Sequence, residues 1–529
     1  MKMISPALML HRIARNYGDK TAFLCGQKSR SWAEMNDRSA RLAGGLLSLG
    51  ARKGDRVVIL GKDGLEVFEH YFACMKSGLV RVSINWRYAS GEIAHILKDC
   101  APRVVLVQAS LVGILVDALE IAGLRGQCEL IGYGGTHGLD RDYEETIAGS
   151  APIEPQNVDP REALVVSYTS GTSGVPKGVV HSVRSVALIL YQGAVSRGLT
   201  TDDVWYPAIS SSWMASALSM IGLVNGMTTV VMDGSFDVDS FIDEVQRHKV
   251  TATLLVPTLI RRVLDRCEGR EQALSSLRLL AYGSEPITVS LLKRVTRTLN
   301  AKMLQTYGLT EGGWLCHLTP SDHLMALSGK PDLLRSAGRP GGMYEISIRS
   351  EQGEELPNGD VGEIWVKGET TMLGYLNLPE LTQQVLVDGW LRTHDIGRID
   401  AAGYLYLIDR KNFMIISGAV NIYPSSVEAI LELHPSVDEI CVVGAPHPQW
   451  GEAVVAVIRP RHGQGLPGVD ELRAFADARL SRMELPKHVL ALEEFPRTST
   501  GKVNRRAIRD HVHAQASGLP WWHNEKAEL

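Results

Sequence analysis

The sequence of 529 residues lacks several patterns that would assign a chain to a class at once. Its seven cysteines are scattered and form no CxxC pair, which argues against both a disulfide framework and a cysteine zinc site. Its sixteen histidines form no HExxH pair, so the common zinc-protease motif is missing too. These absences predict reduced thiols in a cytoplasmic protein.

Strong charge of either sign is also lacking, because the formal net charge is -4. A chain with so little charge has no general attraction for nucleic acid or for an anionic membrane, so any phosphate binding must be local. The first nineteen residues have no sustained apolar core, and we expect no signal peptide. We expect neither nucleic acid nor a membrane as a partner.

One uncharged segment, Val204 to Met232, is long enough to cross a bilayer. Pro207, Asn225 and Gly226 interrupt it. A buried helix from about Trp213 to Val224, followed by a strand from Thr228 to Val231, accounts for the same residues. We therefore favour the buried interpretation over a membrane span.

The most informative stretch is the loop at residues 168–178, which reads YTSGTSGVPKG between two apolar runs. Glycine permits close backbone approach, so successive N–H groups can line one anion-binding concavity. The spacing differs from the Walker A motif. A flexible Ser/Gly linker is the plainer alternative, but linkers seldom hold a Pro-Lys pair between apolar runs. The residues that we expect at the phosphate are Thr169, Ser170, Gly171, Thr172, Ser173, Gly174 and Lys177.

Helix-like and strand-like segments alternate from residue 31 to about residue 300. The capping-box pattern from Ser31 to Glu34 marks the start of the first of these helices. Such alternation predicts mostly parallel sheets with helices on their faces. From about Gly338 short strands and turns dominate, with a hairpin signal at Asn358-Gly359. Beyond residue 412 two helices and two strands suggest a compact α+β unit.

The predicted fold class is therefore α/β, with a large N-terminal domain of two α/β-layered subdomains and a small β-barrel-like subdomain, followed by a small mobile α+β C-terminal domain. We place the large domain at residues 1–409, a hinge at 410–412 and the small domain at 413–529.

Seven separated motifs together make the chain resemble the adenylate-forming enzymes, the family of acyl-CoA synthetases, aryl-CoA ligases, luciferases and peptide-synthetase adenylation domains. The resemblance covers nearly the whole chain. Its motifs are the phosphate loop, Gly283-Ser284-Glu285-Pro286, Tyr307 to Glu311, Gly389 to Asp395, Asp409-Arg410-Lys411, Ile416 to Pro424, and Pro496 to Lys502.

The resemblance implies a site for ATP. Gly283, Ser284, Glu285 and Pro286 would form one wall of the adenine slot, and Tyr307 would stack on the base. Thr310 would meet the α-phosphate, and Glu311 would hold Mg²⁺, a hard cation that prefers oxygen ligands. The ribose hydroxyls would bind Asp395, and Arg410 would reach the ribose or the phosphate. Taken alone, each of these residues could equally be an ordinary turn, core or surface residue.

Among the motif residues, Lys502 says most about how the reaction would proceed. Carboxylate and ATP are both anions, so attack on the α-phosphorus needs cations to stabilise the developing charge. The resemblance gives this task to Mg²⁺, Lys177 and Lys502. It also implies a second half-reaction, in which a thiol attacks the acyl-adenylate after the small domain has turned about a hinge at Asn412. Ser417, Gly418 and Ala419 would then line the thiol channel.

Three positions depart from the family pattern. His394 and Ala419 stand where glycine is common, and Asn412 stands where Asp or Lys is common. We find no role for His394 in the sequence. Ala419 would narrow the access of the thiol.

The acyl pocket would be lined by Trp213, Met214, Gly312 and Trp314. These side chains suit an apolar acid, although buried Trp and Met are more often simply core. The sequence singles out no Lys or Arg as the partner of a second carboxylate. We therefore expect a medium-chain or aromatic monocarboxylic acid.

The function predicted is that of an acid:CoA ligase using ATP and Mg²⁺, with CoA as co-substrate. A stand-alone adenylation enzyme that loads a separate carrier protein is the first alternative. A nucleotide-binding interaction protein without turnover is the second. The sequence leaves a homodimer open.

Overall fold

The computed structural model describes residues 5–169, 175–212, 214–284, 287–417, 420–497, 503–515 and 519–521. The chain divides into two compact units. The large unit comprises residues 1–346, 365–392 and 401–405, and the small unit comprises residues 347–364, 393–400 and 406–529. The domain boundary at residue 409 and the hinge at Asn412 stay predictions.

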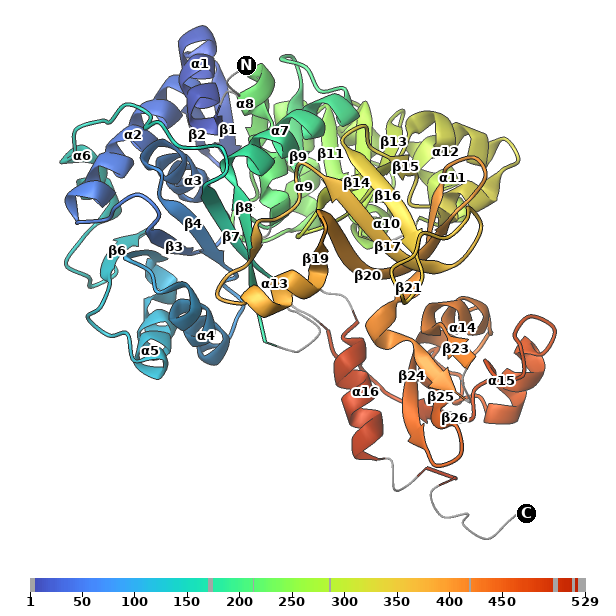
Figure 1. Cartoon of the computed structure of the whole chain (residues 1–529). Helices are drawn as coiled ribbons and strands as arrows, with labels where there is room; N and C mark the ends of the chain where they lie inside the picture. The colour runs from blue at the N-terminus through green and yellow to red at the C-terminus, as the bar shows by residue number, and fades with distance from the viewer. Residues whose placement is uncertain are drawn as a thin grey trace. The chain divides into compact units, whose positions relative to one another are not determined.

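The first sheet of the large unit has seven strands in the order β18-β8-β7-β4-β3-β5-β6. Figure 1 labels β3, β4, β6, β7 and β8 of this sheet. The strands β3, β4, β5, β6 and β7 run parallel, and β8 and β18 are antiparallel additions. Their bounds are β3 Arg56–Leu60, β4 Val80–Ile84, β5 Val104–Gln108, β6 Glu129–Tyr133, β7 Ala163–Thr169, β8 Lys177–Ser182 and β18 Gly374–Tyr375.

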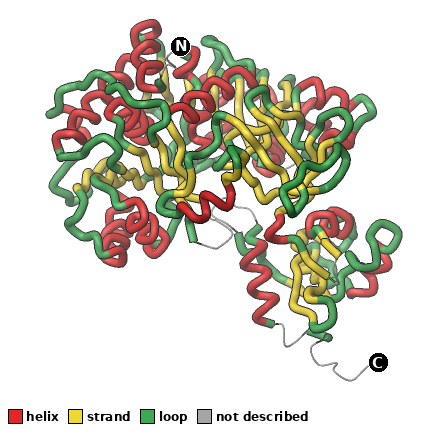
Figure 2. Tube along the Cα trace, in the orientation of Figure 1, coloured by secondary structure: helices red, strands yellow, loops and turns green. Residues whose placement is uncertain are grey.

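Alternate side chains of this sheet enter two separate cores, as the two-residue period of a strand requires. Val58 and Leu60 pack with helices α4 (Ser90–Cys100) and α5 (Val112–Ala122). Val57 and Ile59 pack on the opposite face with α2 (Trp32–Ser48), α3 (Leu65–Ser77) and α6 (Tyr143–Ala148). Figure 2 shows these helices on both sides of the strands. Each fully buried aliphatic side chain contributes about 1.5–3 kcal/mol.

The second sheet has nine strands in the order β15-β14-β13-β12-β11-β9-β10-β1-β2. Its bounds are β1 Thr21–Cys25, β2 Lys28–Ser31, β9 Val204–Pro207, β10 Thr228–Val230, β11 Ala252–Leu255, β12 Leu279–Gly283, β13 Lys302–Leu309, β14 Gly313–Leu318 and β15 Arg339–Pro340. Helix α7 (Val183–Arg197) packs on this sheet through Ala194, which shares a core with Trp205 and Leu279. The remaining helices of the unit are α1 Pro6–Tyr17, α8 Gly222–Asn225, α9 Val238–His248, α10 Pro257–Arg266, α11 Val289–Thr298, α12 Pro320–Leu327 and α13 Pro379–Val385.

The uncharged segment 204–232 is part of this core. No helix among the described residues is long and apolar enough to span a bilayer. The single helix expected over 213–224 is divided in two, because the chain forms a 3-10 helix over Met214–Met220 and then the short α8. The expected strand is β10.

A five-stranded sheet follows in the order β16-β17-β20-β19, with β21 beside β20. This is the short-strand region expected after residue 338. The bounds are β16 Tyr344–Arg349, β17 Gly362–Gly368, β19 Leu386–Val387, β20 Trp390–Ile399 and β21 Leu405–Arg410.

The small unit is the predicted α+β fold. Val442 and Val454 pack with α14 (Pro424–Leu431) and α15 (Val469–Ala476), whereas Val443 and Val455 pack on the other face with α16 (Arg505–Ala514). The strands of its sheet are β22 Ile415–Ser417, β23 Val420–Ile422, β24 Val437–His447, β25 Gly451–Pro460 and β26 His488–Ala491. The two long strands β24 and β25 thus carry a separate core on each face.

All seven cysteines are free thiols, and six of them are buried. Cys128 is half-buried. Burial raises the pKa of Cys74 and Cys100 to about 12 and that of Cys128 to about 11. At neutral pH these groups are therefore protonated and unreactive.

Candidate active site

The predicted phosphate loop connects the antiparallel strands β7 and β8 of the seven-stranded sheet. Thr169 ends β7 and lies opposite Lys177, the first residue of β8. The other predicted phosphate contacts, Ser170, Gly171, Thr172, Ser173 and Gly174, lie outside the described residues. The two flanking strands therefore fix where the loop begins and ends.

Lys177, Tyr375 and Glu311 form a polar group at this hairpin, in the large unit. The Lys177 ammonium lies 5.7 Å from the centre of the Tyr375 ring, within cation–π range. The Tyr375 hydroxyl donates a hydrogen bond of 3.0 Å to Oε1 of Glu311. Strand β18 holds Tyr375 in place, because Tyr375 pairs with Val179 of β8. The structure thus brings the predicted phosphate lysine and the predicted metal ligand to one place.

A buried histidine fixes the backbone at Thr310, the residue expected at the α-phosphate. Nε2 of His181 lies 2.6 Å from the Thr310 carbonyl oxygen, and Nδ1 lies 3.1 Å from Oγ of Ser185. Since a carbonyl only accepts, Nε2 carries the proton. Burial lowers the pKa of His181 to about 4, so the ring is neutral at physiological pH. The sequence did not identify His181, whose partner lies 129 positions away.

The expected adenine wall begins at the end of β12. Gly283 pairs with Thr306 of β13, and a Cβ at position 283 would lie 2.6 Å from the Thr306 carbonyl oxygen. Only glycine fits this approach. Ser284 follows with a left-handed φ of 69°, which turns the chain sharply out of the strand. Glu285 and Pro286 lie outside the described residues. Tyr307 lies in β13, where a register shift separates it from Gly308.

The segment expected to line the acyl pocket is held by a buried hydrogen-bond network. Thr370 Oγ1 donates to the Gly312 carbonyl at 2.7 Å, and the Tyr344 hydroxyl lies 2.6 Å from Thr370 Oγ1 and 3.1 Å from Oε1 of Gln192. Gln192 also donates to the Trp314 carbonyl at 2.6 Å. Both Gly312 and Trp314 are therefore fixed through their backbones.

The other two residues expected in the acyl pocket are neighbours in the sequence. Met214 is a core residue in the structure, 5% exposed, and its sulfur lies 3.9 Å from Oγ of Ser167. The residue before it, Trp213, lies outside the described residues.

Two buried charged residues hold the start of the same pocket segment from behind. The Ser211 N–H donates to Oδ1 of Asp63 at 2.6 Å, and the Ser211 carbonyl accepts from Nη2 of Arg81 at 2.9 Å. Arg81 also lies 4.3 Å from the centre of the Tyr71 ring. Burial raises the pKa of the Asp63 carboxyl to about 6. The sequence did not identify this pair.

The small unit holds the two residues expected at the ribose. Oδ1 of Asp395 lies 2.9 Å from Nε of Arg410, and Asp395 is 5% exposed. The preceding residue, His394, has a left-handed φ of 58° and lies 3.3 Å from Oε1 of the buried Glu363. Glu363 also pairs with Lys411 at 3.3 Å. The left-handed backbone explains why glycine is common at position 394 in the family that the sequence resembles.

The other predicted residues of the small unit are placed only in part. Asn412 lies in a short 3-10 helix, Lys411–Phe413, and its carbonyl accepts from Arg509 at 3.4 Å. Ser417 is fully buried, and its hydroxyl has no hydrogen-bond partner among the described residues. Gly418, Ala419 and Lys502 lie outside the described residues.

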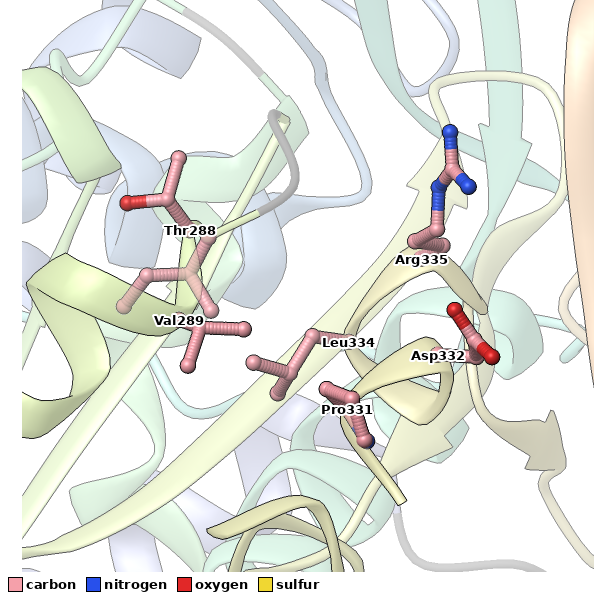
Figure 3. Close-up of a pocket in the computed structure, with 7 residues that line it drawn as sticks. Thr288, Val289, Pro331, Asp332, Leu334 and Arg335 are labelled. Atoms are coloured by element: carbon pink, nitrogen blue, oxygen red, sulfur yellow. The ribbon is translucent and has the colours of Figure 1, made fainter. Parts of the chain in front are cut away.

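A separate hollow of about 300 Å³ lies in the large unit between the start of α11 and a 3-10 helix over Pro331–Arg335 (Figure 3). The side chains of Val289 and Leu334 point toward each other across it. None of the predicted site residues that the structure describes lines this hollow. Its lining residues are Ile287, Thr288, Val289, Pro331, Asp332, Leu334 and Arg335.

Comparison with known proteins decides the family. Residues 10–376 match the family model of the AMP-binding enzymes, and residues 426–502 match that of the AMP-binding enzyme C-terminal domain. The chain belongs to the adenylate-forming, AMP-binding enzymes. The resemblance seen in the sequence is thereby confirmed, and the interpretation as an interaction protein without turnover is set aside.

Several relatives of this adenylate-forming enzyme align along nearly its whole length. A protein named fatty acid–[acyl-carrier-protein] ligase ScoC, from Streptomyces coeruleorubidus, is 32% identical over 508 residues, 92% of this chain and 93% of that protein. One named indoleacetate–CoA ligase, from Aromatoleum aromaticum, is 32% identical over 505 residues, 93% and 95% of the two chains.

A solved structure, the amide bond synthetase McbA from Marinactinospora thermotolerans, has a TM-score of 0.84 and 30% identity, and the likeness covers 96% of this chain and 99% of that one. The α/β fold class with a separate C-terminal domain is confirmed by this likeness. The family model and the relatives named CoA ligases make this chain an enzyme of the acyl-CoA ligase type.

Proposed function

We propose that the protein is an ATP-dependent acid:CoA ligase that acts on a medium-chain or aromatic monocarboxylic acid. In the first half-reaction an oxygen of the acid attacks the α-phosphorus of ATP, the bond to the β-phosphate oxygen breaks, and pyrophosphate leaves. In the second, the thiol sulfur of CoA attacks the acyl carbon, the bond to the phosphate oxygen breaks and AMP leaves, while the thiol proton passes to solvent.

The grouping of Lys177, Tyr375 and Glu311 is the observation that carries this proposal. It places a fixed cation and an oriented carboxylate at the end of the hairpin that bears the phosphate loop. Lys177 would neutralise phosphate charge as the anionic acid approaches, and Thr310 would contact the α-phosphate from a backbone held by His181.

The chemistry of Glu311 fits a magnesium ion. Its carboxylate is a hard oxygen donor, and no group of three or more acidic, histidine or cysteine side chains suited to a metal occurs among the described residues. A cation bound mainly through substrate phosphates and one carboxylate is typical for Mg²⁺. Bound there, Mg²⁺ would offset the negative charge of the phosphates, and the Tyr375 hydroxyl would orient the carboxylate that holds it.

The residues of the small unit would bind the ribose. Its hinge would allow the rearrangement between the two half-reactions. Asp395 and Arg410 are already paired, which holds the carboxylate in one orientation for the ribose hydroxyls. We assign the hinge to Asn412, the thiol channel to Ser417, Gly418 and Ala419, and the cation at the transferring group to Lys502. We also infer a cytoplasmic location, which the free buried thiols support.

The proposed function and its alternative differ in the molecule that accepts the acyl group, which is CoA in the first and a carrier protein in the second. A relative of this chain is named for loading an acyl carrier protein, and another for CoA. Loading of a separate carrier protein is therefore the second candidate.

The decisive experiment measures acid-dependent pyrophosphate release from ATP over a panel of acids, followed by product analysis with CoA, with a holo acyl carrier protein, or with an amine as acceptor. Thioester formation with CoA is the expected result. If pyrophosphate forms but only the carrier protein is acylated, the alternative holds. If no acid in a broad panel supports pyrophosphate release, both candidates fail.

A further inference from the structure

Helix α4 of the large unit presents two polar side chains to segments that lie far from it in the sequence. His95 and Asp99 are four positions apart, a spacing that places both on one side of a helix. Elsewhere on the helix, the buried side chains of Ile93 and Leu97 pack in the core of the seven-stranded sheet. Because this core fixes α4, the helix is a firm support for whatever its polar side chains hold.

His95 holds the second end of the phosphate-loop hairpin. Its Nε2 lies 3.0 Å from the carbonyl oxygen of Pro176, the residue before Lys177. A carbonyl only accepts, so Nε2 carries the proton and donates it. This carbonyl belongs to the peptide bond that joins Pro176 to Lys177. The hydrogen bond therefore orients the backbone from which the Lys177 side chain starts.

Asp99 holds the first end of the same hairpin. The Tyr168 hydroxyl donates to Oδ2 of Asp99 at 2.7 Å. Tyr168 is 3% exposed, and burial raises its pKa far above the usual value, so the hydroxyl keeps its proton. Tyr168 pairs with Gly178 of β8, and a Cβ at position 178 would lie 3.1 Å from Cζ of the Tyr168 ring. The ring therefore packs directly against the strand that begins with Lys177.

The other oxygen of Asp99 binds the segment that follows Tyr375. Nδ2 of Asn377 donates to Oδ1 of Asp99 at 3.0 Å and to the Asp99 backbone carbonyl at 2.8 Å. Asn377 has a left-handed φ of 54°, a conformation in which asparagine is enriched. Asp99 thus uses both carboxylate oxygens to hold two segments that are more than two hundred positions apart.

These contacts support the polar group of Lys177, Tyr375 and Glu311 from outside it. His95 acts one residue from Lys177, and Asp99 acts through Asn377, two residues from Tyr375. A misplacement of about 1 Å at a reacting site can cost about 100-fold in rate. The hydrogen bonds made by α4 are therefore expected to affect how well this group meets its phosphates.

We propose that His95 and Asp99 are positioning residues, which hold the Lys177 ammonium and the Tyr375 hydroxyl where the β- and γ-phosphates of ATP bind. This inference rests on the proposed function, which places the phosphates of ATP at the Lys177 group. It assigns to α4 the support of the part of the site from which pyrophosphate leaves. AMP and the acyl-adenylate lack both of these phosphates, so neither ligand should depend on the two residues.

The test compares the affinity of the full-length protein for ATP with Mg²⁺ and for AMP, both measured by isothermal titration calorimetry. His95→Phe removes the donor to the Pro176 carbonyl. We expect its Kd for ATP to rise about tenfold or more, as for a misplaced binding group, and its Kd for AMP to stay constant. His95→Gln, whose amide can still donate, should recover part of the affinity for ATP.

Two further variants test the Asp99 contacts. Asp99→Leu removes both acceptor oxygens, and Tyr168→Phe removes one hydroxyl and keeps the ring. Both should weaken binding of ATP and leave binding of AMP constant, and Tyr168→Phe tests the contact even if Asp99→Leu does not fold. The matched control is Lys98→Ala, an exposed residue in the same turn of α4. That control should keep both wild-type affinities.

The two half-reactions provide a second readout. In His95→Phe, kcat/KM for ATP in pyrophosphate release should fall about tenfold or more, while thioester formation from supplied acyl-adenylate keeps its wild-type rate. A merely structural role would weaken ATP and AMP binding together and slow both half-reactions.

Such a parallel loss would overturn the proposal. An unchanged affinity for ATP in either His95→Phe or Tyr168→Phe would overturn it as well, and the proposed ligase function would stand. If no acid supports pyrophosphate release by the wild type, the ligase function fails, and the affinities for ATP and AMP still decide the role of α4.

Discussion

The imidazole of His181 donates a hydrogen bond of 2.6 Å to the carbonyl of Thr310. This contact connects the second strand of the phosphate-loop hairpin to the turn that carries Thr310 and Glu311. Two segments that would hold the triphosphate from different sides are therefore held at a fixed separation by one buried, neutral side chain.

Replacement of His181 should slow adenylate formation without abolishing folding. His181→Phe removes the donor to Thr310, and a displacement of the order of 1 Å at a reacting group costs up to about 100-fold in rate. We expect pyrophosphate release to fall about 10- to 100-fold in kcat. His181→Asn, which can still donate, should recover part of this loss. Equal activity of wild type and His181→Phe would show that the contact does not position the site.

Tyr375→Phe isolates the hydroxyl that donates to Glu311 at 3.0 Å. The ring that faces Lys177 is kept. A hydrogen bond to a charged group contributes about 1.5–3 kcal/mol, so we expect the concentration of Mg²⁺ required for half-maximal rate to rise about tenfold or more. Titration of pyrophosphate release with Mg²⁺ measures it. An unchanged Mg²⁺ requirement would argue against Glu311 as the metal ligand.

Asp63→Asn should weaken binding of the acid and leave ATP binding intact. The variant loses the charged acceptor of the Ser211 N–H. The pocket segment that starts near Ser211 would then be held less firmly. We expect KM for the acid to rise about tenfold, as for loss of a charged hydrogen bond, and KM for ATP to stay constant.

At low pH the wild type should also bind the substrate acid more weakly. Burial raises the pKa of Asp63 to about 6, so its carboxylate is protonated below that pH. Its KM for the acid should therefore rise as pH falls below about 6, while Asp63→Asn shows no such rise. The charged groups that act on Asp63 include Arg87 and Arg81. A parallel pH response of both proteins would contradict the assignment.

His70 should make the large unit sensitive to acid. Burial, and secondarily the charge of Arg81, lowers the pKa of His70 to about 3, whereas in the unfolded chain it is close to about 6.5. Between these values the unfolded state binds one proton more, so the free energy of unfolding falls as pH decreases, by about 1.4 kcal/mol per pH unit.

His70→Gln lacks this titration and can still donate to the Val57 carbonyl, which accepts from His70 at 3.2 Å. From pH 7.5 to 5.5 we expect the wild type to lose about 1 kcal/mol more stability than the variant, measured by denaturant unfolding. Identical pH profiles would exclude a neutral buried His70.

Lys502→Ala separates the two half-reactions. We expect adenylate formation to fall about 100-fold or more, as for the loss of a donor that stabilises developing charge. Thioester formation from supplied acyl-adenylate should survive. If the rates of both half-reactions fell equally, Lys502 would not act in adenylate formation alone, and the assignment would be wrong.

Local signals in the sequence predicted the elements well. The capping box at Ser31 and Glu34 forms with both hydrogen bonds and starts α2. The apolar runs predict strands over residues 56–60 and 80–84, and β3 and β4 have these bounds. A run of apolar residues between turn signals defines a buried strand without reference to distant residues. The segment 213–224 was harder, since an uncharged run does not distinguish a 3-10 helix from an α-helix.

The supporting residues of the site could not be predicted in the same way. Asp63 and Ser211 are 148 positions apart, and His95 meets Pro176 across 81 positions. No spacing rule links such pairs, because they are created by tertiary packing. The motifs identified the groups expected to meet ATP, and the structure adds the buried residues that orient some of them.

The unreactive cysteines make this enzyme suited to site-specific labelling. Six of its thiols are buried, and the half-buried Cys128 has a pKa of about 11. A cysteine introduced at an exposed position, such as Glu432→Cys on the small unit, would therefore react with a maleimide dye far faster than the native thiols. A second such position on the large unit would allow energy transfer between two dyes to follow the small unit during turnover, in a protein whose own seven cysteines need not be removed.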